Sequence, residues 1–165
     1  MHKETRKVNN TMGAERTDNT SLVPKYSFPA TLAEQEAALE TNPLLQRLLA
    51  NRKRYEGDPH RPVYHYVNPE NTLNDPNGLC FWQDRWHLFY QACPPEDPRQ
   101  HWGHAVSDDL IHWQDLPYAI YPNPEERCYS GAALALGMTG APVSFSQLSS
   151  NGSCETATML PTLVP

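Results

Sequence analysis

The chain has 165 residues, a formal net charge of −6 and a sequence pI of about 5.6. This length is enough for one domain with a hydrophobic core. The acidic balance predicts none of the basic surface that nucleic acids and other polyanions require. No apolar run approaches the roughly 20 residues of a membrane-spanning helix. We therefore expect no nucleic-acid partner and no membrane partner.

The cellular compartment is inferred from the N-terminus and the cysteines. Residues 1–20 are polar and lack the apolar centre of a signal peptide. The chain has four cysteines without CxxC spacing: Cys80, Cys93, Cys128 and Cys154. This spacing favours free thiols over a disulfide or zinc framework. Together these features predict a cytoplasmic protein.

Residues 1–30 are predicted to be a flexible lead-in, and residues 31–56 a helical segment. The lead-in is polar and contains two prolines. Thr31 and Glu34 have the spacing of a capping box, which starts a helix, and Pro43 suits the first turn of a second helix. Four leucines give that second helix one apolar face: Leu44, Leu45, Leu48 and Leu49.

Residues 57–135 are predicted to be mainly β. Short aromatic and β-branched runs alternate with turn residues about every 8–12 positions, a pattern typical of a sandwich, barrel or propeller. Two of the runs flank a short turn and predict a hairpin. The predicted strands are 63–67, 79–82, 86–91 (the hairpin pair being 79–82 and 86–91), 101–107, 111–113 and 128–134. The pattern ends near Ala135, so residues 136–165 are expected to be an unstructured or aberrant tail.

The histidines and paired aspartates do not predict a second chemical centre. His101 and His104 are three residues apart on a predicted strand, where their side chains point to opposite faces. His112 adds no zinc-ligand spacing. Asp108 and Asp109 lie between strands, where aspartate commonly forms turns. We expect neither a metal nor a cofactor.

The most informative segment is Asn74–Gly78, with the sequence Asn-Asp-Pro-Asn-Gly. Its last four residues fit a type I turn, because Asp, Pro and Gly each occupy a position where that residue is favoured. Taken alone, the tetrapeptide is better explained as a tight turn than as a catalytic site. The motifs that follow it change this interpretation, because they place Asp75 in a recognisable series.

Four further motifs follow in order: Phe89–Gln91, Trp102–Ala105, Asp108–Trp113 and Tyr129–Gly131. With Asn74–Gly78, they resemble glycoside hydrolase family 32, which includes invertases, levanases, inulinases and sucrose-6-phosphate hydrolases. The resemblance runs from about residue 65 to residue 134. It implies a five-bladed β-propeller, of which this chain would hold the first one to two blades. It also implies hydrolysis of terminal β-D-fructofuranosides, such as sucrose and fructans, with retention of configuration.

The resemblance also implies roles for individual residues. Asp75 matches the nucleophile that forms a fructosyl-enzyme intermediate. Retaining glycosidases need such a carboxylate and a second carboxyl group about 5 Å away, which acts as the acid. The residues that match those binding the sugar or lining its subsite are Asn74, Gln91, Trp102, Tyr129 and Ser130. Trp102 is expected to supply an apolar wall, and the expected ligand is a small or oligomeric fructoside.

The chain departs from the family pattern at three points. Thr72 stands where the family usually has a tryptophan. The family's stabilising aspartate lies in an Arg-Asp-Pro motif, whereas Asp97–Arg99 has another order and lies close to Asp75 in the sequence. The family's general-acid glutamate precedes a cysteine, whereas Cys154–Glu155 reverses that order.

These departures lead us to expect a truncated or frameshifted family member that lacks the general acid. The alternative is a non-catalytic carbohydrate-binding fragment that keeps part of the fructose subsite. A related furanosidase acting on arabinose polymers is a weaker third reading, because the Asn-Asp-Pro-Asn-Gly and Phe-Tyr-Gln motifs speak against it.

Overall fold

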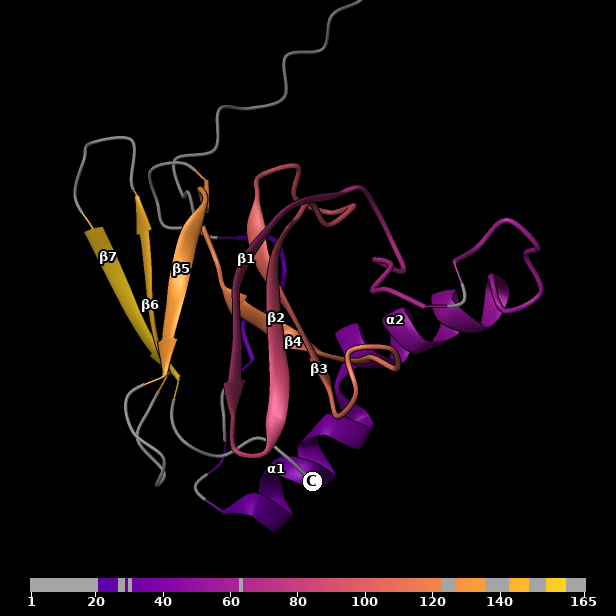
Figure 1. Cartoon of the computed structure of the whole chain (residues 1–165), viewed down its shortest axis with the longest axis horizontal. Coiled ribbons are helices and arrows are strands. Elements are labelled where there is room, and N and C mark those ends of the chain that lie inside the picture. Colours follow the sequence, from indigo (N-terminus) through magenta and orange to yellow (C-terminus); the bar gives the residue numbers. More distant parts are fainter. Residues whose placement is uncertain are drawn as a thin grey trace, which may run out of the picture.

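The computed structural model describes residues 21–26, 29, 31–62, 64–122, 127–135, 143–148 and 154–159. In these residues two α-helices are followed by two antiparallel sheets (Figure 1). The first sheet has four strands in the order β1-β2-β3-β4, and the second has three in the order β5-β6-β7. The described fold is therefore mainly β with a helical N-terminal segment, which confirms the predicted fold class at this level.

The two predicted helices are present. Helix α1 spans Leu32–Thr41 and begins with the expected capping box between Thr31 and Glu34. Helix α2 spans Pro43–Arg54, and the Asn42 side chain caps it by accepting a hydrogen bond from a backbone N–H of its first turn. The helix lies against β4. Its apolar face is buried through Leu44, Leu45 and Leu48, whereas Leu49 is exposed.

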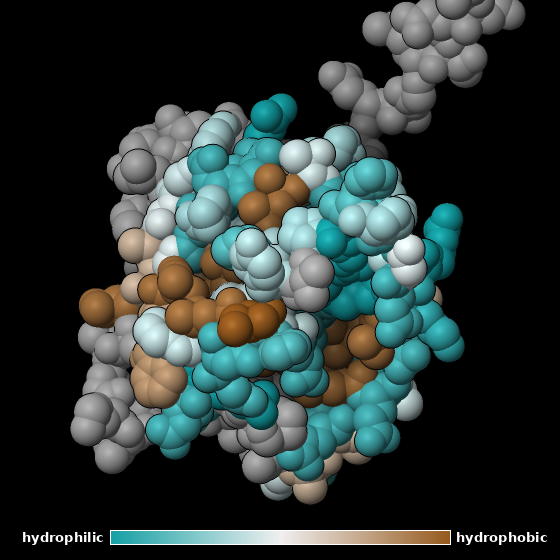
Figure 2. All heavy atoms as spheres, turned by 45° about the vertical axis from the view of Figure 1, so that its right-hand side comes forward, coloured by the Kyte–Doolittle hydropathy of each residue, from teal (hydrophilic) through white to brown (hydrophobic). Residues whose placement is uncertain are grey.

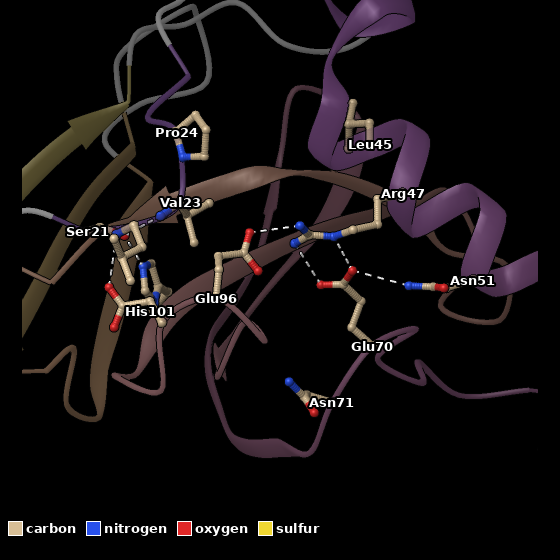
Figure 3. Close-up of polar contacts among 12 residues, drawn as sticks. Ser21, Val23, Pro24, Leu45, Arg47, Asn51, Glu70, Asn71, Glu96 and His101 are labelled. Carbon is tan, nitrogen blue, oxygen red and sulfur yellow. Dashed lines mark hydrogen bonds and ion pairs between the residues drawn. The ribbon is translucent and has the colours of Figure 1, made fainter. Parts of the chain in front are cut away.

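Two arginines fasten α2 to the rest of the domain. Arg47 forms ion pairs with Glu70 and with Glu96, the latter at 2.8 Å (Figure 3). Arg52 binds the buried carboxylate of Asp115 on β4 through two guanidinium nitrogens. Such forked contacts are stronger and more directional than a single ion pair. They fix how the helix is oriented on the sheet.

The first sheet runs through consecutive antiparallel neighbours. Its strands are β1 (Leu73–Trp82), β2 (Arg85–Ala92), β3 (His101–Ser107) and β4 (Gln114–Ile120). The predicted hairpin is confirmed as β1–β2, closed by Gln83 and Asp84. Both residues have positive φ values, 48° and 61°, which match the twist of a two-residue hairpin loop.

Two predicted strands are not strands in the structure. Residues 64–67 form a bend because His65 has a φ of 74°, which is incompatible with an extended strand. Residues 111–113 belong to a loop, in which the Asp109 carboxylate accepts hydrogen bonds from the backbone N–H groups of Ile111 (2.8 Å) and His112 (2.7 Å). The expected turn role of Asp109 is thus confirmed.

The second sheet lies partly in the region expected to be a tail. Its strands are β5 (Gly131–Ala135), β6 (Val143–Leu148) and β7 (Cys154–Met159), paired antiparallel in sequence order. The structure therefore differs from the expected unstructured tail at β6 and β7. In β6 only Val143 and Phe145 alternate with polar residues, which is too short a pattern to predict a strand among the surrounding Ser and Thr residues.

Both faces of the first sheet are buried at β2, β3 and β4, where neighbouring residues of a strand point to opposite sides. Phe89 belongs to one apolar cluster and Tyr90 to the other. The helix-side cluster contains Val23, Leu44, Leu45, Leu48, Leu88, Tyr90, Ala92 and Tyr118. The opposite cluster contains Trp82, Phe89, Trp102, Ile120 and Cys128. The helices and the second sheet accordingly lie on opposite sides of the first sheet (Figure 1).

Part of the expected flexible lead-in is fixed on the sheet. Val23 is 2% exposed and belongs to the helix-side cluster. The Leu22 N–H donates to Asp97 at 3.1 Å, and Ser21 Oγ lies 2.6 Å from His101 Nε2 (Figure 3). The expectation of flexibility is therefore wrong for residues 21–26, and residues 1–20 lie outside the described part of the chain.

The surface is mainly polar on the face shown in Figure 2, with apolar side chains in separate groups. Within the described residues, neither helix is long and apolar enough to cross a membrane. The described cysteines Cys80, Cys93 and Cys128 are free thiols, as predicted.

Two buried histidines, His87 and His104, pair beside Phe89 of the opposite cluster. His87 Nδ1 lies 3.0 Å from His104 Nε2, and His87 Nε2 lies 3.1 Å from the carbonyl oxygen of Trp82. The carbonyl accepts from Nε2–H, so Nδ1 accepts from His104. Burial lowers the pKa of His87 to about 4 and lowers that of His104 well below its ordinary value. His101 instead contacts Tyr118 on the helix side, so His101 and His104 face opposite ways as expected.

We predict that Gly103→Ala destabilises the fold by roughly 2 kcal/mol or more, because overpacking forces side chains out of place. A Cβ at Gly103 would lie 2.2 Å from Cζ of the buried Tyr90 ring. Gly57→Ala is the matched control, since nothing lies within 4 Å of its added Cβ. Urea unfolding of both variants measures the difference, and equal stabilities would contradict the packing described.

We also predict that stability falls as pH drops from 6.5 towards 4. The folded state holds His87 neutral down to about pH 4, whereas the unfolded chain protonates near pH 6.5. Stability from the neutral ring is complete above pH 6.5 and is lost as pH falls, by about 2 kcal/mol at pH 5 from His87 alone. Urea unfolding at several pH values measures this slope. A flat profile in the parent protein would refute it.

Candidate functional site

Asp75 lies in an irregular part of β1 and not in the tight turn predicted for it. Leu73 pairs with Ala92 and Pro76 with Tyr90, so β1 advances three residues while β2 advances two. A second irregularity of the same kind follows between Asn77 and Cys80. Each leaves one extra residue on β1, which is the definition of a β-bulge. Because bulges redirect side chains, Asp75 is exposed although it belongs to a paired strand.

A chain of hydrogen bonds leads to Asp75 from three other segments. Ser130 Oγ donates to Asp75 Oδ2 at 2.5 Å. Gln91 Nε2, on β2, donates to Ser130 Oγ at 3.1 Å. Gln100 Nε2, just before β3, donates to Gln91 Oε1 at 2.9 Å. The carboxylate is therefore oriented by side chains that are far from it in sequence.

The approach of β5 to β1 makes these contacts possible. Asn77 is buried on β1, and its Oδ1 accepts a hydrogen bond from the Gly131 N–H at 3.3 Å. Gly78 has a φ of 54°, and a Cβ there would lie 2.5 Å from Ala133 Cβ. Only glycine combines this dihedral with so close a neighbour. The approach of β5 to β1 thus places Ser130 next to Asp75.

Two hydrogen bonds hold the segment preceding Ser130 against β3 and the loop before it. The indole N–H of Trp102 donates to the carbonyl oxygen of Tyr129 at 2.9 Å. The Cys128 N–H donates to the carbonyl oxygen of Gln100, also at 2.9 Å. Trp102 is fully buried in the opposite cluster. Its predicted role as an apolar wall facing a ligand does not fit this burial, because the ring is covered; it supports Tyr129 instead.

The structure thus brings together most of the predicted site residues. Asp75, Gln91 and Ser130 are joined directly, Tyr129 precedes Ser130, and Asn74 is half-buried next to Asp75 on β1. Two contributors were missed by sequence reasoning. Asn77 had been interpreted only as a turn residue, and Gln100 belongs to no motif that a sequence pattern reveals.

The nearby Asp97 is occupied by structural contacts. Although burial acts to raise its pKa, hydrogen bonds from the Arg99 side chain and from the Leu22 N–H hold the pKa of Asp97 well below its usual range. Arg99 Nη2 lies 2.6 Å from the Asp97 carboxylate. Asp97 therefore fixes the loop between β2 and β3. Glu155 lies on β7, where side chains are outside the described part of the structure.

The arrangement can hold a polyol beside an oriented carboxylate. A carboxylate can attack an electrophilic carbon, and the surrounding amide and hydroxyl groups can exchange hydrogen bonds with sugar hydroxyls. Among groups of three or more described His, Cys, Asp and Glu side chains, none has a metal-binding arrangement. An exposed, oriented carboxylate on a mainly β domain is the kind of site that glycosidases use.

Sequence comparison gives the family. The profile "Glycosyl hydrolases family 32 N-terminal domain" matches residues 65–150, which is more than half of the chain. The chain belongs to this family. The matched range includes Asp75, Gln91, Gln100 and Ser130, so the site described lies inside the family domain.

Named relatives agree with this assignment. The chain is 43% identical over 94 residues to a sucrose-6-phosphate hydrolase of Escherichia coli, covering 54% of this chain and 20% of the relative. It is 43% identical over 82 residues to a levanase of Bacillus subtilis (48% and 12%). It is 32% identical over 139 residues to an invertase of Schizosaccharomyces pombe (82% and 22%). The chain thus spans about a fifth or less of these relatives.

A solved structure shows a similar fold. The fructan 1-exohydrolase IIa of Cichorium intybus, in complex with 1-kestose, is 35% identical with a TM-score of 0.50. The alignment covers 61% of this chain and 20% of that protein.

We predict that Trp102→Phe lowers stability by about 1–2 kcal/mol, because it removes a buried hydrogen bond while keeping most of the apolar ring. The Tyr129 carbonyl would lose the indole donor that lies 2.9 Å away. The control is Trp86→Phe, on β2, whose ring is only partly buried. Urea unfolding measures both variants, and an equal loss in the two would argue against an anchoring role.

Proposed function

We propose that this protein carries the nucleophile half of a glycosidase site that cleaves terminal β-D-fructofuranosides, such as sucrose or a fructan, with retention. The observation that supports the proposal is the exposed carboxylate of Asp75, which receives a 2.5 Å hydrogen bond from Ser130. Membership of family 32 and relatives named as sucrose-6-phosphate hydrolase, levanase and invertase favour fructosides as the substrate class.

In the proposed reaction Asp75 attacks the anomeric carbon of the fructosyl unit and forms a covalent ester, while the glycosidic C–O bond breaks. The leaving oxygen takes a proton from a general acid or, where none is present, from water. Water then releases fructose from this intermediate, so two inversions give overall retention. Asn74, Gln91, Tyr129 and Ser130 bind the fructose hydroxyls. The hydrogen bond from Ser130 orients one carboxylate oxygen, which leaves the other free to approach the sugar.

The proposed architecture is part of a five-bladed β-propeller. The first sheet has the four antiparallel strands of one blade, and β5–β7 provide three strands of the next. In this arrangement β1 and β5 are the neighbouring inner strands, and Asp75 and Ser130 meet where they approach each other. The proposed domain layout is a helical segment at 31–56 and propeller sequence at 57–135, extended by β6 and β7 to residue 159.

No general acid of the proposed site is identified by motif, because Cys154–Glu155 reverses the family's Glu-Cys order. Retention requires a second carboxyl group about 5 Å away as acid and base. Among the described residues, Ser130 is the hydrogen-bonding partner of Asp75, and the side chain of Glu155 is not described. General acid catalysis contributes roughly 10²–10⁴-fold. Sucrose should therefore be hydrolysed slowly by the chain alone.

A fructoside with an activated leaving group separates the enzyme from the alternative, a carbohydrate-binding fragment. 4-Nitrophenyl β-D-fructofuranoside needs no proton on its leaving group, so attack by Asp75 should release nitrophenolate without the general acid. We predict a burst of up to one equivalent followed by slow turnover, because the intermediate lacks a base for its hydrolysis. Stopped-flow absorbance measures the burst.

Asp75→Asn provides the control for this experiment. The variant should lose the burst but keep its affinity for fructose in calorimetry, because the amide keeps the shape of the side chain. Fructose binding without a burst in the parent protein would favour the binding fragment. A burst of undiminished size in Asp75→Asn would contradict the assigned nucleophile.

A further inference from the structure

Gln100 is the outermost member of the hydrogen-bond chain that ends at Asp75, and no motif assigns it a role. Its amide nitrogen lies 2.9 Å from Gln91 Oε1, and Gln91 Nε2 lies 3.1 Å from Ser130 Oγ. The three side chains come from the loop before β3, from β2 and from the residue just before β5. Gln100 therefore touches Asp75 only through two other residues.

The chemistry of Asp75 gives this series of hydrogen bonds a direction. An ionised carboxylate only accepts hydrogen bonds, so the single proton of Ser130 Oγ must point to Asp75. The oxygen of Ser130 then accepts from the amide of Gln91. Gln91 presents its oxygen to the other side, where it requires a donor. Gln100 supplies that donor through its Nε2.

The backbone around Gln100 is fixed independently of its side chain. Its carbonyl oxygen accepts the Cys128 N–H at 2.9 Å. On one side of it, Arg99 is held by Asp97, and the Arg99 carbonyl oxygen lies 2.9 Å from His101 Nδ1. On the other side, His101 is fully buried. A substitution of the Gln100 side chain should therefore leave the loop in place.

We propose that Gln100 is a positioning residue, which fixes the amide orientation of Gln91 and thereby directs the Ser130 proton to Asp75. An amide can turn by half a rotation and exchange its donor and acceptor at almost no steric cost. If Gln91 turns, its oxygen faces Ser130 and competes with Asp75 for the one hydroxyl proton. The donor from Gln100 opposes this, because turning Gln91 while the Gln100 amide stays in place would set two NH₂ groups against each other.

The inference rests on the proposed fructose site for its functional meaning, but its geometry can be tested without a ligand. Two variants separate the donor from the volume of the side chain. Gln100→Met keeps the length and removes the donor, whereas Gln100→Glu replaces the donor by an acceptor. Gln100→Glu should turn the Gln91 amide, because only Nε2 of Gln91 can satisfy the new carboxylate.

Side-chain amide NMR reports the orientation of Gln91 directly. In the parent protein, Ser130→Ala should shift the Gln91 Nε2–H signals, because this amide donates to Ser130. In the Gln100→Glu background, Ser130→Ala should leave them almost unchanged, because the amide faces away. Equal shifts in both backgrounds would overturn the proposal. Protection of the Cys128 amide in every variant shows that the loop is intact.

Calorimetry with fructose tests the consequence for the site. Gln100→Met and Gln100→Glu should each weaken binding about tenfold, as expected for the loss of about one oriented hydrogen bond. Adding Ser130→Ala to either should weaken it no further than Ser130→Ala alone, because both act on the same chain. Gln114→Met, at an exposed position on β4, is the matched control and should bind normally.

Calorimetry with fructose and the NMR comparison test different claims, so one can be contradicted while the other stands. A parent protein that does not bind fructose contradicts the proposed function, while the NMR comparison still decides whether Gln100 orients Gln91. Normal fructose binding by Gln100→Met, together with additive effects of Ser130→Ala, would overturn the positioning role while leaving the fructose site in place.

Discussion

The close approach of β1 and β5 is the constraint on which the site depends. At Gly78 the two strands are so near that a single added carbon would overlap Ala133. The Gly131 N–H closes the contact by donating to the buried Asn77. Without this approach Ser130 would not reach Asp75, because Ser130 directly precedes the second sheet, Asp75 lies on the first, and the two are 55 positions apart in sequence.

The bulges of β1 and the packing of β2 both help to place polar side chains at the site. Two extra residues in β1 let Asp75 face solvent while the strand keeps its pairing with β2. On β2, Phe89 and Gln91 share a face because they are two positions apart. Phe89 is buried in the opposite cluster, and Gln91 lies at the end of that cluster where the polar site begins. The boundary between core and site is thus set by strand alternation.

Features that depend on local sequence were predictable. The capping box at Thr31 and the hairpin over β1 and β2 follow from spacing and turn chemistry within a few residues. Strand β4 was misplaced because Asp109 caps the loop before it, and because Pro117 weakens the strand pattern. The motif around Asp75 predicted a tight turn, and pairing with β2 converted it into a bulged strand. Local propensity was overridden there by the sheet.

The site was predictable only in part, for a physical reason. Asp75, Gln91 and Ser130 could be named because they occur in motifs that resemble a family. Gln100 could not, because it acts through a contact between its side chain in the loop before β3 and the side chain of Gln91 on β2, and such contacts have no fixed spacing. The burial of Trp102 was also hidden, since a tryptophan motif does not reveal which face of the sheet covers the ring.

The central claim is that Asp75 is the nucleophile of a fructoside-cleaving site. Peptide mapping by mass spectrometry, after acid quenching of the reaction with the activated fructoside, tests it most directly. If Asp75 is the nucleophile, one fructosyl unit should be attached as an ester to the peptide that contains it. An adduct on another carboxylate, such as Asp97 or Asp115, or no adduct while nitrophenolate is released, would contradict it.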